Sequence, residues 1–432
     1  MEKLALFGGE AVLKKPLQPY NSIGKEEKEA ATKVMDRKVL SDFVGLSGKF
    51  FLGGKYVKSL EQNFCKYFGV KYAVSFNSAS TALQAAVGAL GIGPGDEVIT
   101  SPYTMSATAS AVLLNNALPV FADIKNDDFC LDYKSIEALI NKNTKAILSV
   151  NIFGGSADYR KILALAKKNK LKVIEDNAQS PGATYYKKFS GTIGDIGVFS
   201  FNVHKVIQAG EGGVLVTNNK KYAFRAQLIR NHGEAVINDL NKSEKIYEPV
   251  LGNNYRITEL QAAIAVEQLK KLKKLNRERI LLANYLTGKL KKFSWLSGCK
   301  NNPGVTHVYY IYPIRFLEEK VGIKRSTFVK AMKAEGFNFN EGYQEPLYLF
   351  PMYQRKQIYP NSNFPFVSKE FSNNANYNRG ICPVAEKMYE KEMLCTNICQ
   401  PPQTKREIDL FIRAIEKIEE NVNILKKHGK KE

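Results

Sequence analysis

Short apolar runs alternate with amphipathic stretches through the first 220 residues of the chain. Several runs have the length and character of buried strands: Y-A-V-S-F, E-V-I-T-S, L-P-V-F-A-D, K-A-I-L-S-V, L-K-V-I-E-D, G-V-F-S-F and G-V-L-V-T. Some are almost continuously apolar, as expected in a parallel sheet that is covered on both faces. Helical patterns at 135–141 and 158–170 lie between them. The alternation predicts an α/β domain that binds its ligands at the carboxyl ends of the strands.

The pattern changes at residue 257, where a charged helical stretch begins and continues to about residue 290. Beyond it we expect a strand and two helices, at 307–316, 325–336 and 405–425. Residues 343–371 are rich in Tyr, Pro, Phe and Asn and are expected to form a long loop. We therefore predict a large domain over residues 1–265 and a smaller α+β domain over residues 266–432.

Length and composition fit this two-domain prediction, because 432 residues are enough for two sizeable cores. No apolar run approaches membrane-spanning length, and the first residues lack the apolar core of a signal peptide. The six cysteines are scattered, and Cys395 and Cys399 have no second pair at zinc-site spacing. We expect a cytoplasmic protein with reduced thiols, no bound metal and no membrane partner.

The net charge of +21 raises the hypothesis of a nucleic-acid partner. However, the basic residues are spread along the whole chain, without a zinc finger, an RNA-binding aromatic motif or a helix-turn-helix signature. We therefore expect no nucleic-acid partner. A basic surface would also attract anionic substrates such as nucleotide diphosphates and dicarboxylates.

The candidate chemistry centres on a lysine and an aspartate that each follow or end an apolar strand. Lys205 stands between F-S-F and the glycine-rich G-E-G-G, and Asp176 ends L-K-V-I-E-D. A pyridoxal phosphate (PLP) enzyme needs a lysine to form a Schiff base with the cofactor aldehyde. It also needs a carboxylate that keeps the pyridine nitrogen protonated. Each residue alone is weak evidence, since a strand-end aspartate is often only a turn or capping residue.

A third segment, residues 73–90, adds a candidate phosphate site. A strand ends near Phe76, and Ser78, Ser80 and Thr81 stand where an alanine- and leucine-rich helix begins. The free N–H groups and the dipole of a helix N-terminus bind phosphate. Taken alone, the segment is better explained by an ordinary Ser/Thr helix cap, because such caps are frequent.

Together these segments resemble the DegT/DnrJ/EryC1/StrS family, the fold-type I PLP-dependent sugar aminotransferases of the aspartate aminotransferase superfamily. Their order and spacing agree from about residue 51 to residue 382. The matching motifs are S-A-S-T-A-L, G-I-G-P-G-D-E-V, E-D-N-A-Q, S-F-x-x-x-K with G-E-G-G, R-N-H-G and G-N-N-Y-R-I-T-E-L-Q-A-A. The resemblance implies a large, mostly parallel sheet domain covered by helices, with a smaller C-terminal α+β domain, and PLP as cofactor.

The resemblance also implies roles for single residues. Lys205 would be the Schiff-base lysine and, once freed, the general acid/base. Asp176 would pair with the pyridine nitrogen, and Gln179 would contact the cofactor ring or its 3′ oxygen. The phosphate would be held by the residues Ala79, Ser80 and Ser200. Asn254 would reach the phosphate from the neighbouring subunit, which implies a homodimer with shared active sites.

Three positions depart from the family pattern. Met105 follows Thr104 where many relatives carry an aromatic residue on the cofactor ring; its thioether would pack on the ring or lie in the core. Asn151 occupies a place often taken by histidine. His204 precedes the lysine and does not replace it, which matters because a dehydratase branch of the family has histidine at the lysine position.

The expected activity is transfer of an amino group from an amino acid, with glutamate as the expected donor, to a keto-sugar. The resemblance implies that the sugar is nucleotide-linked and serves amino-sugar biosynthesis for a surface polysaccharide or a secondary metabolite. One alternative is a glutamine-dependent keto-cyclitol aminotransferase. The retained Lys205 argues against a second alternative, a deoxysugar dehydratase, and the intact motifs argue against a non-catalytic regulator.

Overall fold

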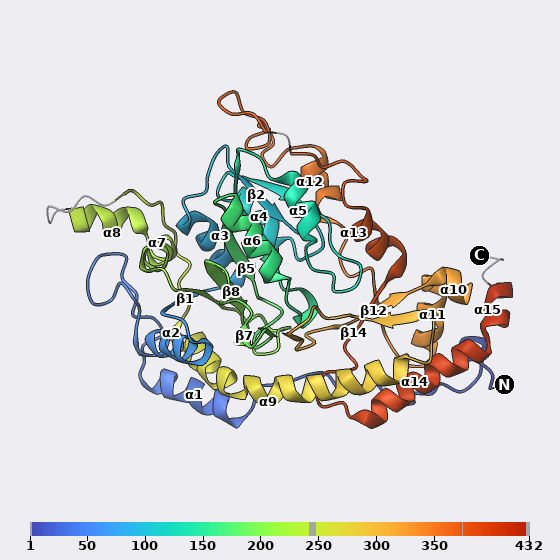
Figure 1. Ribbon diagram of the computed structural model, residues 1–432. Coiled ribbons are helices and arrows are strands. Elements are labelled where there is room, and N and C mark those ends of the chain that lie inside the picture. Colours follow the sequence, from blue (N-terminus) through green and yellow to red (C-terminus); the bar gives the residue numbers. More distant parts are fainter. Residues whose placement is uncertain (1, 242–247, 374, 429–432) are drawn as a thin grey trace.

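The structure, a computed structural model, describes residues 2–241, 248–373 and 375–428 (Figure 1). Its largest sheet has seven strands in the order β1-β9-β8-β5-β4-β2-β3. The strands are β1 (Tyr72–Phe76), β2 (Glu97–Thr100), β3 (Leu118–Phe121), β4 (Thr144–Val150), β5 (Lys172–Asp176), β8 (Ile196–Ser200) and β9 (Gly213–Thr217). Only β9 is antiparallel to its neighbours. The prediction of a mostly parallel sheet is therefore confirmed.

Helices cover both faces of this sheet because its strands are buried on both sides. On β4, Leu148 packs toward one apolar cluster and its neighbour Ile147 toward another. The helices of this part are α2 (Lys55–Phe68), α3 (Ala79–Ala89), α4 (Ala107–Leu113), α5 (Tyr133–Leu139), α6 (Tyr159–Lys168), α7 (Lys220–Arg230) and α8 (Gly233–Leu240). The cluster that contains Leu148 includes residues of α3, α4 and α7, and the cluster that contains Ile147 includes residues of α5 and α6.

A second, antiparallel sheet has four strands in the order β10-β12-β14-β13. Its strands are β10 (Leu296–Gly298), β12 (Tyr312–Phe316), β13 (Asn340–Glu341) and β14 (Met393–Thr396). The helices around it are α10 (Glu318–Val321), α11 (Arg325–Ala334), α13 (Pro383–Lys387), α14 (Lys405–Glu420) and α15 (Val422–His428). Trp295, Phe316, Phe328 and Phe411 belong to the core beneath it.

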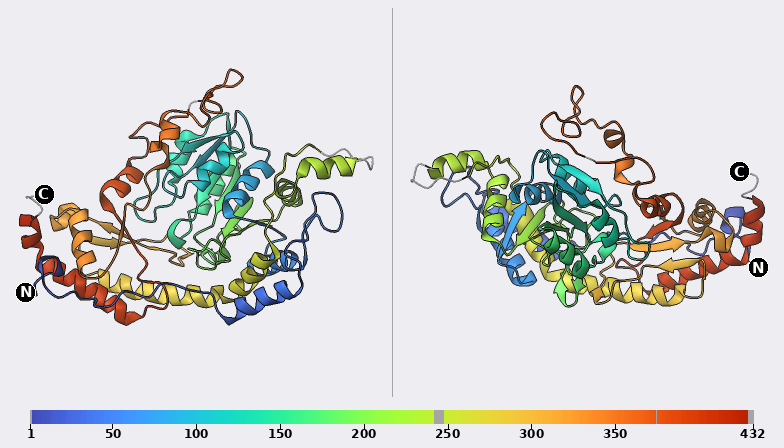
Figure 2. Two further views of the ribbon diagram at one scale, coloured as in Figure 1. Left: turned by 180° about the vertical axis from the view of Figure 1, so that it is seen from behind. Right: turned by 45° about the horizontal axis from the view of Figure 1, so that its top comes forward.

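The long helix α9 (Glu259–Leu290) runs under both sheets, with α1 (Lys25–Asp36) beside its first half (Figures 1 and 2). Leu269 and Leu272 pack with strands of the large sheet, whereas Leu286 and Leu290 pack with the small one. Residue 265 lies inside α9. The domain boundary between residues 265 and 266 stays a prediction.

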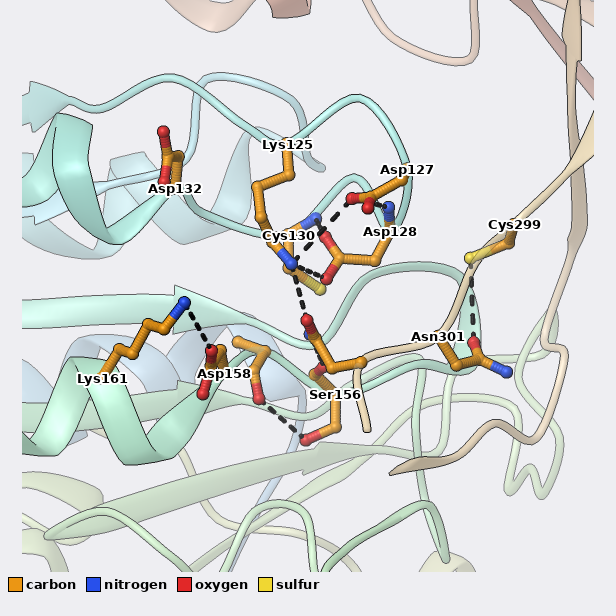
Figure 3. Close-up of polar contacts among 12 residues, drawn as sticks. Lys125, Asp127, Asp128, Cys130, Asp132, Ser156, Asp158, Lys161, Cys299 and Asn301 are labelled. Carbon is orange, nitrogen blue, oxygen red and sulfur yellow. Dashed lines mark hydrogen bonds and ion pairs between the residues drawn. The ribbon is translucent and has the colours of Figure 1, made fainter. Parts of the chain in front are cut away.

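A polar cluster links the two parts at the side of the large sheet that carries β3 (Figure 3). The Lys125 amine pairs with Asp128 and also donates to Asn302 Oδ1 at 2.6 Å. Asn302 in turn donates to the backbone oxygen of Ser156 at 3.1 Å. Nearby, β11 (Val305–Thr306) joins β6 (Thr184–Tyr185) and β7 (Lys188–Phe189) in a small third sheet. Residues 302–306, which follow β10, are thus bound to the large domain by side-chain hydrogen bonds and by strand pairing.

Two predicted elements differ from the structure. The predicted strand 307–316 is regular only from Tyr312. Tyr309 has a left-handed φ of +51°, and the Val308 N–H donates to the Gly154 backbone oxygen and not to a neighbouring strand of the small sheet. The predicted helix 405–425 is broken at Asn421, whose side-chain amide donates to the backbone oxygens of Lys417 and Glu2. Residues 343–371 form a loop that also contains the short helix α12 (Pro351–Gln354).

Within the described residues, no helix combines the length and apolar character needed to cross a membrane. The same residues contain no cluster of three or more His, Cys, Asp or Glu side chains arranged to hold a metal ion.

Candidate active site

The strand ends bring the predicted residues to one edge of the large sheet. Asp176 is the last residue of β5, and Ser200 is the last residue of β8. Ser78 follows β1 and caps α3, and Lys205 lies in the loop between β8 and β9. Because β1, β5 and β8 point the same way, their carboxyl ends meet at this edge.

Asp176 is buried and held by two donors. Its Oδ2 accepts from the Thr108 hydroxyl at 2.8 Å, and its Oδ1 accepts from the Ala178 N–H at 3.1 Å. Burial raises the pKa of the Asp176 carboxyl, while these hydrogen bonds and the charge of Lys205 oppose the rise. Thr108, at the start of α4, fixes the carboxylate; its signal in the sequence is only a threonine four residues after Thr104.

Lys205 sits in a tight turn, in which its N–H donates to the Asn202 backbone oxygen at 2.9 Å. Burial lowers the pKa of its amine to about 8, although the Asp176 charge opposes the shift. An ammonium pKa near 8 leaves a useful neutral fraction at physiological pH, which is the form that attacks a carbonyl carbon. The amine also lies 4.6 Å from the centroid of the Tyr310 ring.

The turn before α3 is a helix cap with free backbone N–H groups that would suit an anion. Ser78 Oγ accepts from the Thr81 N–H at 3.2 Å, as the capping interpretation expects. The N–H groups of Ala79 and Ser80 have no acceptor among the hydrogen bonds of the described residues. A Cβ on Gly213 would lie 2.6 Å from the Ala79 nitrogen, so glycine is needed where β9 approaches this turn. The two free N–H groups fit a phosphate.

Gln179 is buried with both ends of its amide engaged. Its Oε1 accepts from the Phe153 N–H at 2.8 Å, and its Nε2 donates to the Tyr343 hydroxyl at 2.8 Å. Tyr343 also packs edge-on against Phe153, with ring centroids 4.8 Å apart. Tyr343 is not among the residues predicted from the sequence, where its only signal is the aromatic character of the 343–371 segment. Contact of Gln179 with the cofactor stays a prediction.

The remaining predicted residues differ in their surroundings. Met105 is 58% exposed, so the interpretation that its side chain lies in the core is wrong. Packing of its thioether on the cofactor ring stays a prediction. Ser200 Oγ accepts from the Asn202 N–H at 3.2 Å.

Asn151 is buried, and its amide oxygen accepts from the Ala157 N–H at 3.1 Å and from the Tyr159 hydroxyl at 2.9 Å. Asn151 therefore has a structural role, and His204 is exposed beside the lysine.

Asn254 is exposed on a loop close to the phosphate turn of its own chain. Its neighbour Tyr255 accepts, through its backbone oxygen, a hydrogen bond of 2.9 Å from the Asn77 N–H. The Asn254 side-chain oxygen accepts from Arg256 Nε at 2.8 Å. Its predicted reach into a neighbouring subunit stays a prediction.

A cavity of about 980 Å³ opens between the N-terminal segment and the small domain; Lys205 does not line it, but its chain neighbours Val203 and His204 do. Val203, His204 and Tyr310 form the part of its wall next to the lysine. The far wall is rich in amides and carries two lysines: Lys14, Gln18, Lys333, Asn338, Asn340, Asn397, Gln400 and Gln403. Amides and ammonium groups are donors suited to phosphate and sugar oxygens.

These features fit PLP. The free N–H groups before α3 suit its phosphate, the buried Asp176 suits its ring nitrogen, and Lys205 suits its aldehyde carbon. When bound, PLP supplies an electron sink for negative charge that develops on the substrate. A lysine of lowered pKa, a buried strand-end carboxylate and an open helix N-terminus on this sheet define a fold-type I PLP-dependent enzyme.

The chain belongs to the DegT/DnrJ/EryC1/StrS aminotransferase family, whose profile matches residues 26–393. It is 36% identical over 304 residues to a GDP-perosamine synthase of Caulobacter vibrioides, covering 69% of this chain and 79% of that protein. It is 28% identical over 437 residues to a putative L-glutamine:3-amino-2,3-dideoxy-scyllo-inosose aminotransferase of Micromonospora echinospora, covering 99% of both. An aminotransferase structure from Psychrobacter cryohalolentis superposes with a TM-score of 0.80 at 27% identity, covering 94% of this chain and all of that one.

The predicted family, fold and cofactor are thus confirmed, and the protein is a PLP-dependent enzyme of the sugar aminotransferase family.

Proposed function

We propose that the enzyme transfers an amino group from an amino acid, with glutamate as the expected donor, to a nucleotide-linked keto-sugar. The product would enter amino-sugar biosynthesis for a surface polysaccharide or a secondary metabolite. The observation that carries the proposal is the cavity of about 980 Å³ lined in part by His204 and Tyr310, which neighbour Lys205 in sequence and in space, with Lys14 and Lys333 elsewhere in its wall. Its volume is at the upper end of the range for small-molecule sites, and the two ammonium groups suit a diphosphate.

Lys205 would move the proton between the substrate carbon and the cofactor. A general acid/base works best when its pKa lies near the working pH, and the Lys205 pKa of about 8 meets this condition. Asp176 would hold the ring nitrogen, and Thr108 would hold Asp176 in place through its 2.8 Å hydrogen bond. A strand-end carboxylate with fixed orientation needs little reorganisation when charge develops.

The test offers a panel of nucleotide-linked keto-sugars and keto-cyclitols to enzyme in the pyridoxamine form, with mass spectrometry of the products. Lys333→Glu should raise KM for nucleotide-linked acceptors by about 10-fold or more, the usual size of a lost charge-assisted contact. It should leave the KM of an uncharged acceptor unchanged. Lys142→Glu, the same charge change at an exposed site, is the matched control. Amination of keto-cyclitols alone would contradict the proposal.

A glutamine-dependent keto-cyclitol aminotransferase is the second candidate. It is favoured by the similarity to the Micromonospora echinospora protein over 99% of both chains. The same panel, run with glutamate and glutamine as donors, separates the two candidates. A deoxysugar dehydratase is disfavoured because Lys205 is retained.

We further propose a homodimer with shared sites, working in the cytoplasm. Leu251 is 85% exposed close to Asn254, and Leu46 and Phe50 are also about half exposed, as expected for a surface that a second copy covers. All six cysteines are free, which suits a reducing compartment.

Subunit exchange tests the shared site. Asn254→Ala and Lys205→Ala homodimers should each be weak or inactive. After complete exchange, half of the dimers are mixed, and each mixed dimer has one site with both lesions and one intact site. Activity should then recover to roughly a quarter of wild type. No recovery would mean that Asn254 serves its own chain.

A further inference from the structure

One aromatic ring from the small domain directly contacts the Lys205 amine. The amine nitrogen lies 4.6 Å from the centroid of the Tyr310 ring, within the range of a cation–π contact. Among the hydrogen bonds of the described residues, none has this amine as donor. The Tyr310 ring is therefore the ring that this amine contacts within the described residues.

Tyr310 is itself held by the large domain. The Val308 N–H donates to the Gly154 oxygen at 2.8 Å, and the Ile311 N–H donates to the Phe153 oxygen at 3.4 Å. The Tyr310 backbone oxygen accepts from Gln400 Nε2 at 3.0 Å. This segment follows the large domain's backbone instead of continuing β12, which is why the predicted strand begins late.

Gly154 makes this docking possible. Its φ of +108° is in the region that favours glycine. A Cβ at this position would lie 2.5 Å from the Tyr309 nitrogen and 2.7 Å from the Tyr310 nitrogen. A side chain at residue 154 would thus push Tyr310 away from its present place.

Few charged groups influence the amine. Burial lowers the pKa of Lys205, and Asp176, on β5, is the charged side chain that opposes it. The buried Arg279 of α9 acts on the phenol of Tyr310, where burial raises the pKa and the Arg279 charge opposes the rise. Asp176 and the Tyr310 ring therefore act on or contact Lys205 from opposite domains.

We propose that Tyr310 is a positioning residue: its ring holds the free Lys205 amine at the edge of the sheet, facing Asp176, and favours its protonated form. The contact matters whenever the lysine is not bonded to the cofactor, because only then is the amine free to carry a proton. The proposal rests on Lys205 being the catalytic lysine of the proposed function.

The test measures the Lys205 pKa in the enzyme without cofactor, from the pH dependence of lysine labelling read by mass spectrometry. Tyr310→Leu should lower this pKa by about 0.4–0.7 units, which corresponds to a contact of about 0.5–1 kcal/mol at 1.36 kcal/mol per unit. Tyr310→Phe, which keeps the ring, should retain the wild-type value. Tyr186→Leu removes a ring that lies 3.5 Å from the Arg160 guanidinium carbon and should leave Lys205 unchanged.

Gly154→Ala tests the proposal independently, because the added Cβ should displace the Tyr310 ring without removing it. It should shift the Lys205 pKa in the same direction as Tyr310→Leu. An unchanged pKa in folded Tyr310→Leu, or an equal shift in Tyr310→Phe, would overturn the proposal. Failure of the proposed function is distinguishable, because it would appear as no amination of nucleotide-linked keto-sugars by the wild-type enzyme, whatever the Lys205 pKa results.

Discussion

The two sides of the candidate active site differ in how they are built. The large-sheet side consists of strand ends and the turns after them, where Asp176, Ser200 and Lys205 are set by short local motifs. The small-domain side consists of Tyr310 and Tyr343, which come from irregular segments that are held in place by contacts with the large domain. The residues proposed to react therefore come from short sequence motifs, whereas the side chains that position them come from segments distant in the sequence.

The largest effect is expected from Lys205→Ala on the large-sheet side. Turnover should fall by at least about 10⁴-fold, because the variant loses both the nucleophile and the general acid/base. The fold should survive, since the turn at Lys205 is closed by its backbone N–H. Cofactor absorbance and single-turnover kinetics measure the loss. Near-normal transamination would remove the central role of this residue.

Asp176→Asn should come next, with the first half-reaction slowed by about 10²–10³-fold, the cost of losing one fixed electrostatic group. Cofactor affinity should fall much less, because the phosphate contacts remain. Thr108→Val, which removes the 2.8 Å hydrogen bond to Asp176 but keeps the carboxylate, should give a smaller defect. Equal defects in the two variants would show that the position of the carboxylate matters more than its charge.

The pH dependence should reveal the lowered pKa of Lys205. Below pH 8 the amine is mostly protonated, so the neutral, nucleophilic fraction rises about tenfold for each pH unit. The rate at which cofactor-free enzyme captures PLP should therefore rise with pH and level off above about pH 8. Stopped-flow absorbance measures this rate. A rise that continues to pH 10 would mean that the lysine is not perturbed.

The smallest effect is expected from Tyr343→Phe on the small-domain side. It removes the oxygen to which Gln179 Nε2 donates but keeps the ring against Phe153. A lost hydrogen bond between neutral groups corresponds to about 0.5–1.5 kcal/mol, so kcat should fall by roughly 2- to 10-fold. Gln179→Ala, measured alongside, should be worse. A fall in kcat for Tyr343→Phe as large as that for Asp176→Asn would show that the small-domain side matters as much as the large-sheet side.

Much of the site was predictable because its signals are short. The strand runs, the Ser78 cap and the positions of Lys205 and Asp176 follow from apolar patterns and turn chemistry within a few residues. Other features had no local signal. The roles of Thr108 and Tyr343 depend on hydrogen bonds across 68 and 164 positions of sequence.

The sequence by itself determined the strands, the long helix α9 and the helix start at Ser78, because each depends on local backbone preference and apolar spacing, and its family motifs predicted Lys205 as the reactive lysine. Only the tertiary structure decided that residues 307–311 leave the expected strand, dock on Gly154 and place Tyr310 against Lys205. The physical reason is that a backbone N–H bonds to whichever acceptor the folded chain offers. For Val308, that acceptor lies 154 positions away in the sequence, on Gly154.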